Sequence, residues 1–178
     1  MKFLTKPILL WSLLLTGGVF TGCDAITAAA DMTKPGSVIT EPGSEIVMYK
    51  AEGCECCSKW ANHMRMAGFT VIENKHENMD VIKSQHAVSK ALASCHTAIV
   101  DGYVIEGHVP AADVERLLKD KPKIVGLTAP GMPMESPGMQ QSGQIPKKYD
   151  VFAFYADGKS RVFTRYYDGG KFHEFTAY

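Results

Sequence analysis

Apolar and polar residues alternate along the chain with two different periods, which together predict an α/β domain beginning near residue 44. From Cys57 to Gly68, apolar or small residues recur at the three- and four-residue spacing of an amphipathic helix. Short apolar runs bounded by turn residues predict strands. In chain order, the pattern predicts a strand at residues 46–49, a helix at 57–68, a strand at 69–72, a helix at 78–92, strands at 97–100 and 103–105, and a helix at 110–121.

The order of these elements is that of a thioredoxin-like fold. The first two strands would pair in parallel through a crossover helix, and the hairpin with its Asp-Gly turn at 101–102 would complete the sheet. A second hairpin, formed by residues 150–155 and 159–166, is expected to extend this sheet or pack at its edge, with a short strand at 172–178. The predicted fold is therefore an α/β, thioredoxin-like sheet flanked by helices, with an added C-terminal β-hairpin.

The first residues of the chain have the pattern of a secretory signal. Lys2 and Lys6 flank the start of an apolar run at residues 8–20, which is shorter than the about 20 residues of a membrane-spanning helix. The run leads into VFTGCD, which resembles a bacterial lipobox with Cys23 as the lipidated residue, although Phe stands where Leu is usual; ordinary cleavage nearby is the alternative. We expect a lipoprotein-type signal peptide at 1–22, a tether at 23–43 and the domain at 44–178, in the periplasm and anchored to a membrane.

Charge and composition exclude some classes of function. The chain has 19 basic and 19 acidic residues, a formal charge of zero, and no run of basic residues. Nucleic-acid-binding domains ordinarily carry a basic patch or stripe. We therefore expect no nucleic-acid partner, and the ordinary apolar content argues against disorder beyond the termini.

Three of the five cysteines lie in the stretch GCECCSKW at residues 53–60, between a predicted strand and a predicted helix. The unpaired N–H groups and positive partial charge of a helix N-terminus lower the pKa of a thiol placed there. In a thioredoxin-like fold, the loop before the third strand lies opposite this helix N-terminus, and that loop carries another cysteine. The sequence therefore predicts that four cysteines converge: Cys54, Cys56, Cys57 and Cys95.

Two chemistries use such thiolates, disulfide exchange and soft-metal binding. Cys54 and Cys57 form a Cys-x-x-Cys motif at a helix start, as in a thiol-disulfide oxidoreductase. Cys56 and Cys95 would then be superfluous. Clustered thiolates suit bridged Cu(I) ions, whereas a structural zinc site prefers cysteine pairs separated by two to four residues. We favour copper binding; a dithiol oxidoreductase and a passive copper carrier are the alternatives.

Four sequence blocks extend this interpretation to a family. They are YKAEGCECCSKW at residues 49–60, SCHTA at 94–98, GHVPAAD at 107–113 and GLTAPGMP at 126–133. Between residues 46 and 154, the chain resembles the CopG-type periplasmic copper-resistance proteins, a metal-binding family long carried without a known function. The resemblance implies a thioredoxin-like fold and several copper ions, mainly Cu(I), bridged by Cys54, Cys56, Cys57 and Cys95. It also implies a redox role in handling Cu(I) and Cu(II), as in a copper-dependent oxidoreductase. The candidate partners are copper ions and copper chaperones or efflux components; the sequence does not identify which chaperone or pump exchanges the metal.

Histidines supply further candidate ligands. His96 follows Cys95 and would point to the opposite face of the sheet if the segment is strand-like. His108 closes the predicted hairpin and would lie at the same end of the sheet. Each of these two is a candidate copper ligand or a neighbour of the ligands. The other histidines are expected in solvent: His63, His76, His86 and His173.

A methionine-rich segment, PGMPMESPGM at residues 130–139, is named the Met loop here. Its prolines and glycines exclude helix and strand, and its backbone is not expected to be fixed by its own hydrogen bonds. Thioether sulfur is a ligand for Cu(I). Met132, Met134 and Met139 are therefore either copper ligands or a hydrophobic lid over the cysteines.

Overall fold

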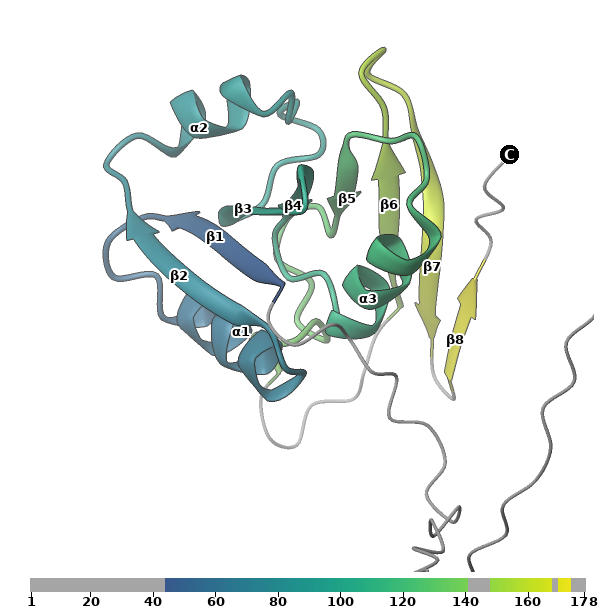
Figure 1. Ribbon diagram of the computed structural model, residues 1–178, viewed down its shortest axis with the longest axis horizontal. Coiled ribbons are helices and arrows are strands. Elements are labelled where there is room, and N and C mark those ends of the chain that lie inside the picture. Colours follow the sequence, from purple (N-terminus) through teal and green to yellow (C-terminus); the bar gives the residue numbers. More distant parts are fainter. Residues whose placement is uncertain (1–43, 141–147, 168–169, 174–178) are drawn as a thin grey trace, which may run out of the picture. The chain divides into compact units, whose positions relative to one another are not determined.

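The predicted strands pair into a mixed β-sheet in the computed structural model, which describes residues 44–140, 148–167 and 170–173. These residues fall within Val38–Tyr178, one of the two units into which the chain divides. The strands are β1 Glu45–Lys50, β2 Thr70–Lys75, β3 His96–Val100, β4 Tyr103–Glu106, β5 Gly126–Thr128, β6 Tyr149–Phe154, β7 Ser160–Tyr167 and β8 Gly170–His173; the helices are α1 Glu55–Met66, α2 Met79–Gln85 and α3 Ala111–Asp120. The sheet order is β2-β1-β3-β4-β5-β6-β7-β8 (Figure 1).

The first four strands form the thioredoxin-like part of the sheet, which confirms the predicted fold. β1 pairs in parallel with β2 and antiparallel with β3, and β4 is antiparallel to β3. Side chains alternate along β3, so that His96 stacks on Trp60 of α1. The next residue, Thr97, accepts a hydrogen bond from Lys83 of α2. α1 and α2 therefore lie on opposite faces of the sheet (Figure 1).

The stripe predicted from helical spacing is the buried face of α1. It consists of Cys57, Trp60, Ala61 and Met64. These side chains pack against Ile46 and Met48 of β1, which have no exposed surface. Burying one large apolar side chain contributes about 1.5–3 kcal/mol, so this contact holds the helix start firmly against the sheet.

Two element boundaries differ from the sequence prediction. α2 covers residues 79–85 rather than 78–92, because Ala87 has a φ of 58°, which an α-helix does not contain. The second strand runs over 70–75 rather than 69–72, because its parallel pairing with β1 continues to the end of both strands. The apolar residues after α2 pack instead in a separate buried cluster: Val88 and Leu92 with Val104 and Phe154.

The C-terminal strands extend the sheet beyond β4. The strand β5 was not predicted; it pairs in parallel with β4, and glycine is required at its first position. A Cβ on Gly126 would lie 1.8 Å from the carbonyl oxygen of Val104. The predicted hairpin is β6 and β7, and β6 pairs with β5. The predicted last strand begins earlier, at Gly170, and residues 174–178 lie outside the described part.

Helix α3 attaches this extension to the rest of the domain. The Arg116 guanidinium lies 3.6 Å from the ring centroid of Phe163 in β7. Asp113 is fully buried and accepts hydrogen bonds from the hydroxyls of Thr164 and Tyr166, at 2.5 and 2.8 Å. Because this buried carboxylate is paired, it fixes α3 to the hairpin rather than destabilising the core.

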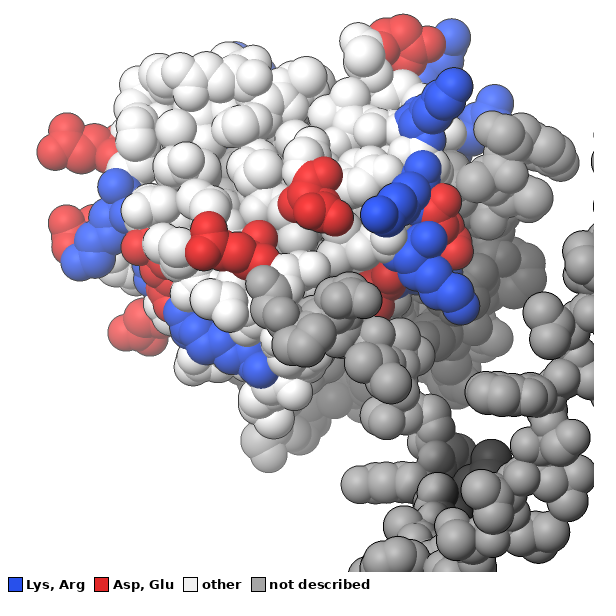
Figure 2. Space-filling model, in the orientation of Figure 1, with Lys and Arg blue, Asp and Glu red and all other residues white. Residues whose placement is uncertain are grey.

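The expected signal peptide, tether and Cys23 lie outside the described residues. Among the helices of the described residues, none combines the length and apolarity needed to cross a bilayer. On the face seen in Figure 2, acidic and basic side chains are interspersed rather than gathered into one basic patch.

Candidate metal centre

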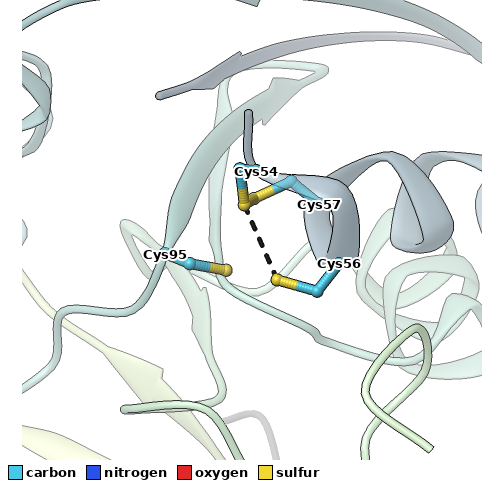
Figure 3. Close-up of side chains that lie close together, drawn as sticks. All are labelled: Cys54, Cys56, Cys57 and Cys95. Atoms are coloured by element: carbon cyan, nitrogen blue, oxygen red, sulfur yellow. Dashed lines mark hydrogen bonds between the residues drawn. A yellow bond between two sulfur atoms is a disulfide. The ribbon is translucent and has the colours of Figure 1, made fainter. Parts of the chain in front are cut away.

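The structure brings the four predicted cysteines together at the N-terminus of α1. Cys54 is the N-cap of the helix, Cys56 and Cys57 are in its first turn, and Cys95 lies in the loop before β3. Their sulfur atoms all lie within 4.8 Å of one another. Figure 3 shows Cys95 reaching from the far segment toward Cys56. We call Cys54, Cys56, Cys57 and Cys95 the Cys cluster.

Two members of the Cys cluster are oxidised in this structure. Cys54 and Cys57 form a disulfide, with their Cα atoms 5.4 Å apart, whereas Cys56 and Cys95 are free (Figure 3). The Cys56 thiol donates a hydrogen bond to Cys54 Sγ at 3.6 Å. The sequence blocks implied four thiolates bridging copper, and the Cys-x-x-Cys motif offered a redox pair as the alternative. A single bridge forms nevertheless, because one helical turn brings the first and last residues of a Cys-x-x-Cys motif within reach.

Burial determines whether the thiol of Cys95, the cluster member from the loop before β3, is protonated. The pKa of Cys95 rises to about 12, first because the thiol is buried and then because a negative charge on Cys56 would lie close by. A thiolate at Cys95 therefore requires a compensating positive charge. A cation bound at this place would supply that charge and would favour the deprotonated form of Cys95.

The two candidate histidines contact Cys95. The Nε2 atom of His108 lies 2.9 Å from Cys95 Sγ, and the Nδ1 atom of His96 lies 3.4 Å from it. The expectation that His96 points away from Cys95 was wrong. Cys95 is in a bend before β3, where the alternation of side chains along a strand does not apply. We call His96 and His108 the His pair. Burial lowers the pKa of both imidazole rings and so keeps them neutral.

A buried carboxylate holds the loop that carries Cys95. Glu106, at the end of β4, has no exposed surface. It accepts hydrogen bonds from Lys83 Nζ at 2.5 Å, from Thr97 Oγ1 at 2.7 Å and from the backbone N–H of Ser94 at 2.6 Å. Sequence reasoning missed this group, which we call the Glu106 clamp. Its signal was a charged residue ending an otherwise apolar strand.

A second polar group fixes the start of α1. Lys50 of β1 forms an ion pair with Glu73 of β2 at 2.9 Å and donates to Ser58, which itself donates to Glu73 at 3.0 Å. Ser58 follows Cys57 directly in the chain. This network was also not predicted, and it ties the first turn of the helix to the two strands beneath it.

The Met loop lies directly against the site. The Pro137 carbonyl accepts a hydrogen bond from His108 Nδ1 at 2.6 Å, and a Cβ on Gly138 would lie 2.9 Å from the carbonyl oxygen of Cys56. Contrary to expectation, the loop contains its own backbone hydrogen bonds, from Ser136 to Pro133 and from Met139 to Ser136, each 3.0 Å long. Turns of this kind suit its Pro and Gly residues.

The three candidate methionines differ in exposure. Met132 is 55% exposed, whereas Met134 and Met139 are half-buried. The loop position supports their proximity to the site, and their role as ligands or as a lid stays a prediction.

Three histidines expected in solvent are half-buried, and the side chain of His173 is not described. His63 of α1 accepts a hydrogen bond from the backbone N–H of Ala111 at the start of α3, at 3.1 Å. The Nδ1 atom of His76 accepts from the N–H of Asn78 at 3.1 Å. Within the described residues, the candidate metal-binding groups contain neither these histidines nor His86.

The fold and the site together define a class: thioredoxin-like proteins with a cysteine cluster where the first helix begins. The family described as "Protein of unknown function, DUF411" matches residues 92–139, which include Cys95, the His pair and the Met loop. A search of curated proteins found no match.

Two solved structures are similar to this chain. "Copper resistance protein copG- Form 1" is 35% identical, with a TM-score of 0.65, and the match covers 69% of this chain and 97% of that one. "Copper resistance protein copG- Form 2" has the same identity and TM-score, and covers 68% and 97%. The chain belongs to the CopG family of copper resistance proteins, as the sequence blocks predicted.

Proposed function

We propose that this protein binds copper as a multinuclear copper–thiolate cluster and so serves copper resistance. The observation that carries the proposal is the convergence of four cysteine sulfurs within 4.8 Å, supplied by two separate segments of the chain. Membership of the CopG family supports copper as the metal. The ligands in this proposal are the four residues of the Cys cluster.

The donor chemistry fits this metal. Thiolate sulfur selects soft ions such as Cu(I), whereas Mg²⁺ and Ca²⁺ require oxygen ligands. In the described residues, both candidate metal-binding groups contain only cysteine and histidine. Several Cu(I) ions would also supply the positive charge that a Cys95 thiolate needs, because burial first and the nearby Cys56 second raise the pKa of Cys95.

Loading of the full cluster requires reduction of the Cys54–Cys57 disulfide. A dithiol reductant supplies two electrons and two protons, opens the bond to two thiols and becomes a disulfide itself. Redox handling of copper would oxidise the Cys54 and Cys57 thiolates back to the disulfide. Two Cu(II) ions each accept one electron from the two thiolates, which gives two Cu(I) ions and the disulfide.

The alternative function, thiol-disulfide exchange, is favoured by one observation. Cys54 and Cys57 form the disulfide at the start of α1, which is where such enzymes place their reactive pair. Disulfide exchange requires only this pair, so Cys56 and Cys95 would have no role in it. A passive copper carrier would use the Cys cluster without electron transfer.

Export to the periplasm and a lipid anchor at Cys23 are part of the proposal, and they rest on the sequence pattern. A protein placed there would exchange copper with a copper chaperone or with efflux components. These partners are inferred from the expected location.

Replacing Cys95 distinguishes the two functions. In Cys95→Ser, copper binding after anaerobic reduction is expected to fall, because a bridging thiolate is lost. Ser84→Ala, an equally small change at an exposed position of α2 away from the Cys cluster, is the control and should leave the copper content unchanged. Copper per chain is measured by elemental analysis, and circular dichroism confirms folding. Unaltered copper content in Cys95→Ser, together with disulfide-exchange activity lost only in Cys54→Ser, would support the oxidoreductase instead.

A further inference from the structure

The Met loop is bound through its backbone to the segment that carries Cys95. Gly131 forms a parallel β-bridge with Ser94, and its N–H donates a hydrogen bond to the Ala93 carbonyl oxygen at 2.9 Å. The Ser94 hydroxyl donates to the Gly131 carbonyl oxygen. Two hydrogen bonds therefore join the Met loop to the residues directly before Cys95.

The Met loop also reaches the other segment of the Cys cluster. A Cβ on Gly138 would lie 2.7 Å from the backbone nitrogen of Trp60 and 2.9 Å from the carbonyl oxygen of Cys56. The backbone of the loop thus lies directly against the first turns of α1. Met132, the residue after Gly131, is 55% exposed, which places the pairing with Ser94 at the surface of the protein.

Exchange at the Cys54–Cys57 disulfide has to begin at Cys54. Cys57 has no exposed surface, whereas Cys54 is half-buried. An attacking thiolate therefore forms a bond to Cys54 Sγ; the bond to Cys57 breaks, and Cys57 leaves as a thiolate that takes up a proton. A second thiol of the reductant then attacks the mixed disulfide and releases Cys54. The reductant ends as a disulfide, having supplied two electrons and two protons.

The kind of reductant decides whether it can approach Cys54 closely. Cys54 Sγ lies within 4.8 Å of Cys95 Sγ, so a polypeptide approaching it would lie along residues 93–95. Extended polypeptides bind such segments by adding a strand, which requires free backbone groups. Here the Ala93 carbonyl is taken by Gly131, and the Ser94 N–H is taken by Glu106. A small thiol needs no such pairing, because it only has to reach one sulfur.

We propose that the Met loop occupies the place of a polypeptide partner beside the disulfide. Ser94 and Gly131 thereby determine a specificity for small thiols over protein dithiols as the reductant. The inference rests on the proposed function in one respect, since loading of the cluster requires this disulfide to be opened. The same mixed disulfide lies on the path in both directions. Protein disulfides would therefore be equally slow to oxidise Cys54 and Cys57.

The test compares two reductants on the copper-free disulfide form of the full chain. Reduction by dithiothreitol, a small dithiol, and by thioredoxin, a protein dithiol, is followed by alkylation of the released thiols and mass spectrometry of the intact protein. In Ser94→Ala, the rate with thioredoxin is expected to rise about fivefold, the factor by which loss of one typical hydrogen bond shifts an opening equilibrium. The rate with dithiothreitol is expected to stay unchanged.

Gly131→Pro is the stronger variant. Proline removes the N–H that binds Ala93 and cannot adopt the φ of 69° found at Gly131, so the rate with thioredoxin is expected to rise on the order of tenfold or more. Circular dichroism checks that the variant folds, and the milder Ser94→Ala decides the question if it does not.

The controls make the same changes elsewhere in the chain. Ser84→Ala, at an exposed position of α2, matches the serine variant. Gly158→Pro matches the glycine variant, because Gly158 also has a positive φ and donates its N–H, to the Tyr155 carbonyl oxygen at 3.0 Å. Neither control should change the ratio of the two rates.

Two results would overturn the inference. Equal acceleration with both reductants in the Met loop variants would mean that the fold is only loosened, and an unchanged rate with thioredoxin would mean that the loop does not exclude it. Because no copper is present in the assay, either result would leave the proposal of a copper cluster untouched. Conversely, a Cys cluster that bound no copper would not alter the ratio of the two rates.

Discussion

Removing the Glu106 carboxylate tests whether a single buried group both stabilises the fold and positions Cys95. In Glu106→Ala, the Lys83 ammonium, whose side chain is only 10% exposed, loses its carboxylate partner. The Ser94 N–H loses its acceptor at the same time. Breaking one side of a buried ion pair costs about 3–5 kcal/mol. We expect the free energy of unfolding to fall by about that amount.

The assay is denaturant unfolding of the disulfide form, followed by circular dichroism. The matched control is Glu52→Ala, which removes a carboxylate paired with Lys75 at 2.5 Å on the surface, where the two side chains are 79% and 63% exposed. No measurable loss is expected there, since exposed ion pairs contribute little. In the double variant Glu106→Leu/Lys83→Met, an apolar pair replaces the ions, and most of the lost stability is expected to return.

Positioning is measured separately from stability. In conditions where Glu106→Ala is folded, the segment that carries Cys95 has lost its backbone hydrogen bond. Removing the supporting partners of metal ligands typically weakens metal affinity by about 10–100-fold. We expect a loss of Cu(I) affinity in that range by competition with a chelator. A stability loss no larger than that of Glu52→Ala, or unchanged Cu(I) affinity, would refute the reasoning.

Three further predictions concern the Met loop and His63 of α1. Replacing the three methionines of the Met loop with Leu should change the melting temperature little, and it should slow copper transfer to a Cu(I) chelator only if their sulfurs bind copper. Burial lowers the pKa of His63 in the folded protein, so the neutral ring contributes to the free energy of unfolding above about pH 6.5, and this contribution is lost as the pH falls. In His63→Gln, unfolding measured across this pH range should therefore show a smaller loss of stability in acid. Gly138→Ala should destabilise more than Gly158→Ala, because both have positive φ but only Gly138 meets backbone atoms, at 2.7 Å; equal melting temperatures would contradict this.

The sequence predicted the parts of the fold that depend on local pattern. The stripe of α1 and the Asp-Gly turn at residues 101–102 follow from spacing and turn chemistry, and both were confirmed. The strand β5 was missed because it has only three residues and depends on pairing with neighbours on both sides. The end of α2 was missed because the apolar residues after it follow a helical spacing while packing elsewhere.

The site was predictable where it depended on fold topology. The expected position of Cys95 opposite the start of α1 required only the order of the elements, and the structure places it there. The orientation of His96 was not predictable, because it depends on a bend at Cys95 that no pattern marks. The partners of Glu106 come from α2, β3 and the preceding loop, so their meeting is visible only in three dimensions.

The most direct test of the central claim is the number of copper ions bound per chain before and after reduction of the Cys54–Cys57 disulfide. The protein is loaded anaerobically with Cu(I), freed of excess copper, and analysed for metal and for thiols in the same sample. The reduced form, in which the whole Cys cluster is available, is predicted to bind more than one Cu(I) per chain and to bind more than the disulfide form does. One metal ion or fewer in the reduced form, or equal copper content in the two forms, would contradict a multinuclear cluster on these cysteines.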